Sequence, residues 1–136
     1  MTQIRISAAA SLLGVSDDTL RRWIDQGRLE ASTDESGRRV VDGSRLATLA
    51  QEIAADHPVD QLDDSASVRS SRNHLTGLVT GVKSDPVMSQ VELQCGRYRI
   101  VSLISTEAVE ELGIEVGVVA TAVIKATNVS VERNRT

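Results

Sequence analysis

The spacing of apolar residues changes once along this chain of 136 residues, from a helical period to a strand period. In the first half, Leu20, Trp23 and Ile24 recur at i, i+3 and i+4, the buried stripe of an amphipathic helix. In the second half, Val91 and Leu93 alternate with polar residues, as in a half-buried strand. These two periods need two kinds of packing, so we predict an α+β protein with two domains.

An acidic segment lies where the period changes. Residues 56–69 hold four aspartates against one arginine, whereas residues 1–55 carry a net charge of −1 and residues 70–136 are balanced. A stretch without a sustained period and with an excess of one charge is typical of a solvated connector. We therefore predict a helical domain over residues 1–55, a flexible acidic linker over 56–69 and a β-rich domain over 70–136.

Composition excludes several classes of function. The net charge of −4 argues against a generally basic nucleic-acid binder, and two aromatic residues cannot form a stacking platform for single strands. No apolar run approaches the ~20 residues of a membrane span, and no signal sequence opens the chain. The single cysteine, Cys95, excludes an internal disulfide and a cysteine-based zinc site. We expect a cytoplasmic protein with no membrane partner and no metal-cation site.

The first half has the order of a helix-turn-helix. A short helix ends at Gly14, and Ser16 then caps a second helix that has two aspartates in its first turn, where the helix dipole favours them. The pair Arg21 and Arg22 lies off the apolar stripe of this second helix. A turn-rich segment and a short strand follow over residues 32–41, which predicts a β-hairpin, or wing.

These residues resemble the winged helix-turn-helix of the MerR-like/excisionase superfamily, through Ile6-Ser7, then Thr19-Leu20-Arg21-Arg22-Trp23-Ile24-Asp25-Gln26-Gly27-Arg28-Leu29, and Gly37-Arg38-Arg39-Val40-Val41. The resemblance implies that the second helix enters the major groove of double-stranded DNA and that the wing follows the backbone. By position, it implies DNA contacts from Ser16, Thr19, Arg21, Arg22, Arg38 and Arg39. We expect one such near-neutral module to bind weakly, so that tight binding needs an oligomer.

The second half has the pattern of a small antiparallel barrel. We predict five strands, near residues 75–82, 90–95, 97–104, 118–125 and 129–131, and one short helix over 106–112. A sheet this short is marginal alone, and oligomerisation is the usual remedy.

Two clusters rich in hydrogen-bond donors flank this barrel: Ser70-Ser71-Arg72-Asn73 before the first strand and Lys125-Ala126-Thr127-Asn128 after the fourth. A tetrahedral dianion offers acceptors alone, so its site must consist of donors such as guanidinium, ammonium, hydroxyl and backbone N–H groups. The clusters therefore predict a site for a small oxyanion. We expect Asn73 to satisfy local backbone groups and Cys95 to be a core thiol.

The order of these pieces resembles the Mop domain (molbindin-like, TOBE superfamily). The supporting residues are Ser70-Ser71-Arg72-Asn73, Gly77-x-Val79, Ile104-Ser105-Thr106-Glu107-Ala108-Val109-Glu110-Glu111-Leu112-Gly113, Gly117 and the run from Thr121 to Val129. The resemblance implies an OB-like barrel that binds molybdate or tungstate at an interface between identical subunits. It assigns the ligand contacts to Ser70, Arg72, Ser105, Lys125, Ala126 and Thr127. Ala108 stands where some relatives have a serine, so one contact is expected to be missing or replaced.

Together these features predict a molybdate-responsive transcriptional regulator and no enzyme, because no catalytic constellation is visible. Two alternatives stay open. One is a molybdate store whose helix-turn-helix serves assembly or protein contacts. The other is an architectural DNA-binding factor whose barrel serves oligomerisation.

Overall fold

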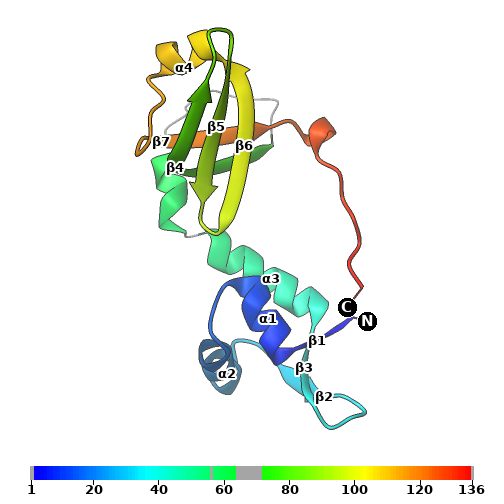
Figure 1. Ribbon diagram of the computed structural model, residues 1–136. Helices are drawn as coiled ribbons and strands as arrows, with labels where there is room; N and C mark the ends of the chain where they lie inside the picture. Colours follow the sequence, from blue (N-terminus) through cyan, green and yellow to red (C-terminus); the bar gives the residue numbers. More distant parts are fainter. Residues whose placement is uncertain (1, 56, 64–71, 136) are drawn as a thin grey trace. The chain divides into compact units, whose positions relative to one another are not determined.

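The computed structural model describes residues 2–55, 57–63 and 72–135. The chain divides into two compact units, one of residues 1–57 with 134–136 and one of residues 58–133. Each unit has its own hydrophobic core, and both units are drawn in Figure 1.

The first unit is a winged helix-turn-helix, as predicted. Its elements are β1 (Gln3–Arg5), α1 (Ile6–Leu13), α2 (Asp17–Asp25), β2 (Ala31–Thr33), β3 (Arg39–Asp42) and α3 (Gly43–Ala55). The left-handed Gly14 ends α1, and Ser16 caps α2 by accepting the N–H of Thr19 at 3.1 Å. These two local devices set the tight turn between the helices.

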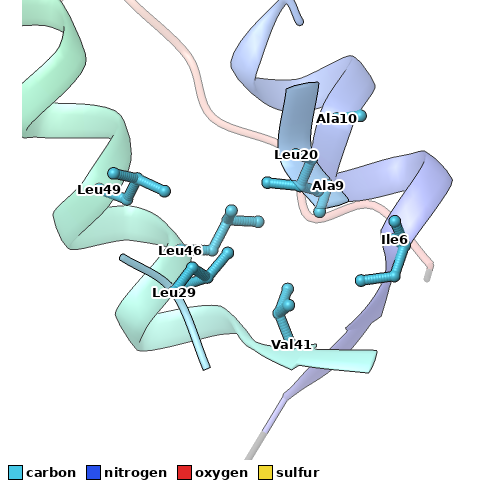
Figure 2. Close-up of a cluster of buried hydrophobic side chains, with 8 residues drawn as sticks. All are labelled: Ile6, Ala9, Ala10, Leu20, Leu29, Val41, Leu46 and Leu49. Atoms are coloured by element: carbon cyan, nitrogen blue, oxygen red, sulfur yellow. The ribbon is translucent and has the colours of Figure 1, made fainter. Parts of the chain in front are cut away.

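The helices and the sheet of this unit share one apolar core (Figure 2). Its buried members come from α1, α2, α3, β3 and the segment after α2: Ile6, Ala9, Ala10, Leu20, Leu29, Val41, Leu46 and Leu49. Leu20 is fully buried, which is why the apolar stripe of α2 faces inward and leaves its arginines outside.

The wing is the β2–β3 hairpin, in a sheet of order β1-β3-β2. Its turn is organised by Asp34, whose Oδ1 accepts the N–H groups of Ser36 and Arg38, each at 2.9 Å. Gly37 takes a positive φ of 78°, a conformation that favours glycine. The turn-rich composition of residues 32–37 therefore forms the expected hairpin end.

The second unit is a curled antiparallel sheet of order β6-β5-β4-β7 with an OB-like, half-barrel shape (Figure 1). Its strands are β4 (Asn73–Ser84), β5 (Met88–Cys95), β6 (Tyr98–Ser105) and β7 (Val119–Ile124). The helix α4 (Thr106–Leu112) and the 3-10 turns η1 (Pro58–Leu62) and η2 (Ala126–Asn128) complete it. Val79, Val91, Leu93, Cys95 and Val109 form its buried core.

The bend of β4 allows one strand to pair with both neighbours. The first half of β4 pairs with β7, the second half pairs with β5, and a bulge lies between Val79 and Gly81. At Gly77 the strands come so close that a Cβ would lie 2.2 Å from the carbonyl oxygen of Gln94. Glycine is therefore required at this bend.

The predicted fifth strand is wrong. Among the residues that the structure describes, the second unit has four strands, and residues 129–135 have no regular structure. The turn η2 interrupts the chain directly after β7, and Val131 is 90% exposed. The alternation of valines there has no buried face to occupy within this chain, and alternation without burial does not specify a strand.

Candidate functional site

Strand register brings Arg72 and Asn73, the described residues of the first donor cluster, to the same end of the sheet as the second cluster. Asn73, the first residue of β4, pairs with Ile124, the last residue of β7. Its side-chain amide also donates to the Ile124 carbonyl oxygen at 3.1 Å, so Asn73 satisfies a backbone group as predicted. The residues that follow outward from this pair are Arg72 and Lys125, both exposed. Two cationic residues from opposite ends of the domain sequence thus flank the same end of the β4–β7 pair.

The chain after Lys125 adds backbone donors to this end of the sheet. Lys125 is extended, at φ −64° and ψ 140°, and directly precedes the η2 turn. Asn128 N–H donates to the Lys125 carbonyl oxygen at 2.9 Å. The first N–H groups of such a turn, from Ala126 and Thr127, have no acceptor within it. The exposed Thr127 hydroxyl adds a further donor to the chain segment that follows Lys125.

Ser105 lies elsewhere. It ends β6 opposite Met88 of β5, beside the turn that follows Ser84 at the far end of β4 (Figure 1). Its hydroxyl oxygen accepts the N–H of Ala108 at 3.0 Å, which caps α4 and leaves the hydroxyl proton as a donor. Within one chain, therefore, Ser105 is not part of the Arg72–Lys125 cluster. Ser70 lies outside the described residues.

A network of hydroxyl groups, which the sequence reasoning missed, holds the Ser105 end of the sheet together. The Oγ of the buried Ser89 lies 2.7 Å from Ser84 Oγ and 2.8 Å from Thr106 Oγ1. Thr106 Oγ1 in turn donates to the Asp85 carbonyl oxygen at 2.7 Å. The sequence carries one weak sign of this network: Ser89 is polar at a position of β5 where the alternation favours an apolar residue.

Asp85 closes the adjoining turn. Its Oδ1 accepts the N–H groups of Val87 at 2.7 Å and Met88 at 2.8 Å. These hydrogen bonds, Met88 first, hold the pKa of the Asp85 carboxyl below its ordinary value because they favour the ionised form. The start of α4, and with it Ser105, is thereby fixed to the β4–β5 turn.

The thiol of Cys95 is buried and is not presented at the surface. Cys95 is buried on the inner face of β5, and its Sγ donates to the Leu75 carbonyl oxygen at 3.5 Å. Burial raises the pKa of its thiol, which disfavours the reactive thiolate. The prediction of a core thiol is consistent with this environment.

In the first unit, the predicted DNA contacts divide into two kinds. Ser16 and Thr19 bond to each other, since Ser16 Oγ also donates to Thr19 Oγ1 at 2.9 Å. Arg21 and Arg22 are exposed on α2, and Arg21 lies 3.8 Å from Asp18. An exposed pair of this kind is weak and is easily exchanged for a phosphate partner. The hydroxyl residues thus shape the start of the helix, and the arginines supply its charge.

The wing carries the remaining two predicted contacts. Arg38 follows the Asp34 turn, and Arg39 opens β3 opposite Thr33; both arginines are exposed. The sequence predicted no role for Arg28, which packs within the unit. Arg28 places its guanidinium 4.7 Å from the centre of the Trp23 ring, a cation–π distance, because the left-handed Gly27 turns the chain back after α2. The signal was the glycine directly before Arg28.

The described residues form neither a metal-binding cluster of side chains nor a membrane-spanning helix. Residues 2–55, 57–63 and 72–135 contain no group of three or more His, Cys, Asp or Glu side chains that could hold a metal ion. No helix in that part of the chain is long and apolar enough to cross a membrane.

Comparison with known proteins agrees with this division of the chain. The model of the MerR family regulatory proteins matches residues 5–41, and the model of the TOBE domain matches residues 69–131. Molybdenum-pterin-binding protein 1 of Clostridium pasteurianum is 44% identical over 63 residues, which are 46% of this chain and 93% of that relative. The chain belongs to the TOBE-domain family of molybdenum-pterin-binding proteins. Both resemblances predicted from the sequence are confirmed.

Solved structures from this family align with the same half. MopII from Clostridium pasteurianum aligns over 100% of its chain and 48% of this one, at 42% identity and a TM-score of 0.45. The cytoplasmic molybdate-binding protein ModG, solved with molybdate bound, aligns over 46% of its chain and 47% of this one, at 42% identity and a TM-score of 0.45.

Proposed function

We propose that this protein is a molybdate-responsive, DNA-binding transcriptional regulator of the cytoplasm, and not an enzyme. Its TOBE domain binds molybdate or tungstate, and its MerR-like unit binds double-stranded DNA. The observation that carries the proposal is the Asn73–Ile124 pair, which puts Arg72 and Lys125 at the same end of the sheet, in a family named for molybdenum binding.

The chemistry of the cluster suits a tetrahedral dianion. Arg72 and Lys125 neutralise its two charges, and the Thr127 hydroxyl with the N–H groups of Ala126 and Thr127 donates to its oxygens. Because the cluster is exposed in a single chain, water would compete strongly there. A second chain that covers the anion would remove this competition.

The position of Ser105 supports a site shared between chains. Ser105 lies at the other end of β4 from Arg72 and Lys125, so its hydroxyl contacts the same anion as these cations if it comes from a neighbouring subunit. The open, apolar inner face of the half-barrel, with an accessible volume of about 300 Å³ between β5, β6, β7 and α4, gives a homo-oligomer a surface to bury.

Equilibrium dialysis against molybdate tests the ligand. Wild-type protein is expected to bind it, and Arg72→Ala to lose at least tenfold in affinity, since a charge-assisted hydrogen bond contributes about 1.5–3 kcal/mol. Arg97→Ala is the matched control, because Arg97 is equally exposed but lies at the β5–β6 turn, over the Tyr98 ring. Equal binding by both variants would contradict the proposed site.

Mixing two inactive variants tests whether the site is shared. Arg72→Glu and Ser105→Glu each place a carboxylate where the anion is proposed to bind, and each alone should fail to bind molybdate. If every site takes Arg72 from one chain and Ser105 from its neighbour, random 1:1 oligomers regain about a quarter of the wild-type sites. A site within one chain regains none.

The exposed arginines of α2 and of the wing support the DNA-binding role. A gel shift on the gene's own upstream region, with and without molybdate, is expected to detect binding that molybdate alters and that Arg21→Ala and Arg38→Ala weaken. Arg97→Ala again serves as the control. Because each lost phosphate contact lowers the salt dependence of binding by about one unit of slope, the same variants should show a shallower salt titration.

Molybdate storage is the alternative, and one observation favours it. The molybdenum-pterin-binding relative matches the second half of this chain alone over 93% of its own length, so a protein of this family exists with almost no chain beyond that half. Molybdate binding with no shift in either gel condition, for wild type and Arg21→Ala alike, would assign the chain to storage.

A further inference from the structure

The connector between the two units is attached to the barrel. Of the predicted linker, residues 58–62 form the η1 turn, which lies against β4 and belongs to the second unit. Val59 of this turn is half-buried. Directly after η1, Asp63 Oδ2 lies 3.1 Å from His74 Nδ1.

This contact is more sheltered than an ordinary surface ion pair. The side chain of His74 is 27% exposed and that of Asp63 is 20% exposed, whereas the surface pair of Arg21 with Asp18 is 56% and 97% exposed. A sheltered contact holds its geometry better than an exposed one. It joins residues eleven positions apart and therefore closes a loop of the chain.

The attachment leaves little chain between the units. The helix α3 ends at Ala55, and the His57 N–H still donates to the Ala54 carbonyl oxygen at 3.1 Å. Pro58 then begins η1. The first unit extends to His57 and the second begins at Pro58, so the units follow each other directly in the chain while η1 stays on β4.

Release of η1 from β4 would greatly lengthen the chain that connects the two units. The chain from residue 56 to residue 71 has 16 residues. Freed from β4, a connector of that length has a root-mean-square span of roughly 22 Å. A change of this size alters the spacing that two DNA-binding units of an oligomer can reach, and half-sites on DNA lie about 34 Å apart or multiples of that.

We propose that the Asp63–His74 pair is a latch that holds the connector on β4, and that molybdate bound at Arg72 strengthens it. The second part rests on the proposed function. Arg72 is two residues before His74, at the start of β4. A ligand that orders Arg72 orders the strand end that carries His74, so closing the latch loses less conformational freedom when molybdate is bound.

Hydrogen–deuterium exchange of the full chain tests the latch without molybdate. Asp63→Ala and His74→Ala are each expected to speed amide exchange over residues 59–63 by roughly five- to tenfold, the loss of one hydrogen bond. The double variant should be no faster than the faster single variant, because both changes break the same contact. Glu111→Ala removes a carboxylate from the exposed face of α4 and is the control.

Small-angle scattering gives the second readout. A longer link should raise the radius of gyration of Asp63→Ala and His74→Ala, with the circular dichroism of each variant as the check of folding. His74→Asn keeps a donor for Asp63 and should stay closer to wild type. Exchange and scattering that match the Glu111→Ala control in both variants, or exchange effects that add in the double variant, would overturn the latch.

Repeating the exchange experiment with molybdate tests the coupling, and its failure can be distinguished from failure of the proposed function. Saturating molybdate should slow exchange over residues 59–63 in wild type and leave Asp63→Ala unchanged, while calorimetry finds molybdate affinities within about threefold for the two proteins. Wild type that binds molybdate with no slowing would overturn the coupling. Wild type that binds no molybdate would overturn the proposed function, and the ligand-free exchange experiment would still decide the latch.

Discussion

The side-chain amide of Asn73 donates to the Ile124 carbonyl oxygen at 3.1 Å, between residues 51 positions apart in the chain. This bond fastens the start of β4 to the end of β7. It also sets the place where Arg72 and Lys125 leave the sheet together. The proposed anion site therefore depends on a residue that does not itself contact the anion.

Removal of this bond should weaken molybdate binding without unfolding the barrel. In Asn73→Ala, the Ile124 carbonyl oxygen loses its side-chain donor, and we expect a loss of about 1 kcal/mol in unfolding free energy. Molybdate affinity should fall by roughly fivefold in calorimetry, because the two cations lose their fixed spacing. Gln94→Ala removes an exposed amide that bonds to the Gly96 carbonyl oxygen and should leave the affinity unchanged.

Replacing glycine by alanine should reduce the stability of the fold at one position of β4 far more than at another. In Gly77→Ala, the new Cβ would lie 2.2 Å from the Gln94 carbonyl oxygen, which forces β4 and β5 apart. In Gly81→Ala, the nearest atom is 3.7 Å away, in ordinary contact. We expect urea denaturation to show a loss of at least about 2–3 kcal/mol for the first and under about 1 kcal/mol for the second.

Acid should weaken the turn that carries α4. The pKa of Asp85 is lowered in the fold by the N–H groups of Met88 and Val87. Its carboxylate therefore adds stability that is present above the ordinary pKa of 3.8 and lost as the pH falls through the lower folded value. Compared with Asp85→Asn, wild type should be more stable at pH 6, and the difference should shrink toward pH 2–3. Denaturation curves across this range measure it, with Glu110→Gln on the exposed face of α4 as the control.

Truncation of Leu20 should destabilise the winged unit, whereas truncation of Leu12 should not. Leu20 is fully buried among residues of α1, α3 and β3, whereas Leu12 is 64% exposed on α1. Leu20→Ala is expected to lower the unfolding free energy of this unit by about 2–5 kcal/mol and to abolish the gel shift. Leu12→Ala should change the stability by less than about 1 kcal/mol. Loss of DNA binding in the Leu12 variant at normal stability would instead indicate a contact surface on α1.

The features that the sequence alone determined are those whose causes lie within a few residues. Ser16 caps α2 by bonding to Thr19, three positions on, and Gly14 ends α1 through its own backbone conformation. The alternation around Val91 and Leu93 places both side chains on the buried face of β5. Caps, turns and periods of this kind are local, so they can be predicted before any tertiary contact is known.

The tertiary structure decided what the register and bend of the strands bring together. It placed Arg72 and Lys125 at the same end of the β4–β7 pair, moved Ser105 to the other end of β4, and left Val131 without a buried face. It also attached Asp63 to His74. None of these relationships has a local signature, because pairing between distant strands follows from the packing of the whole sheet, here with Gly77 at its tightest approach.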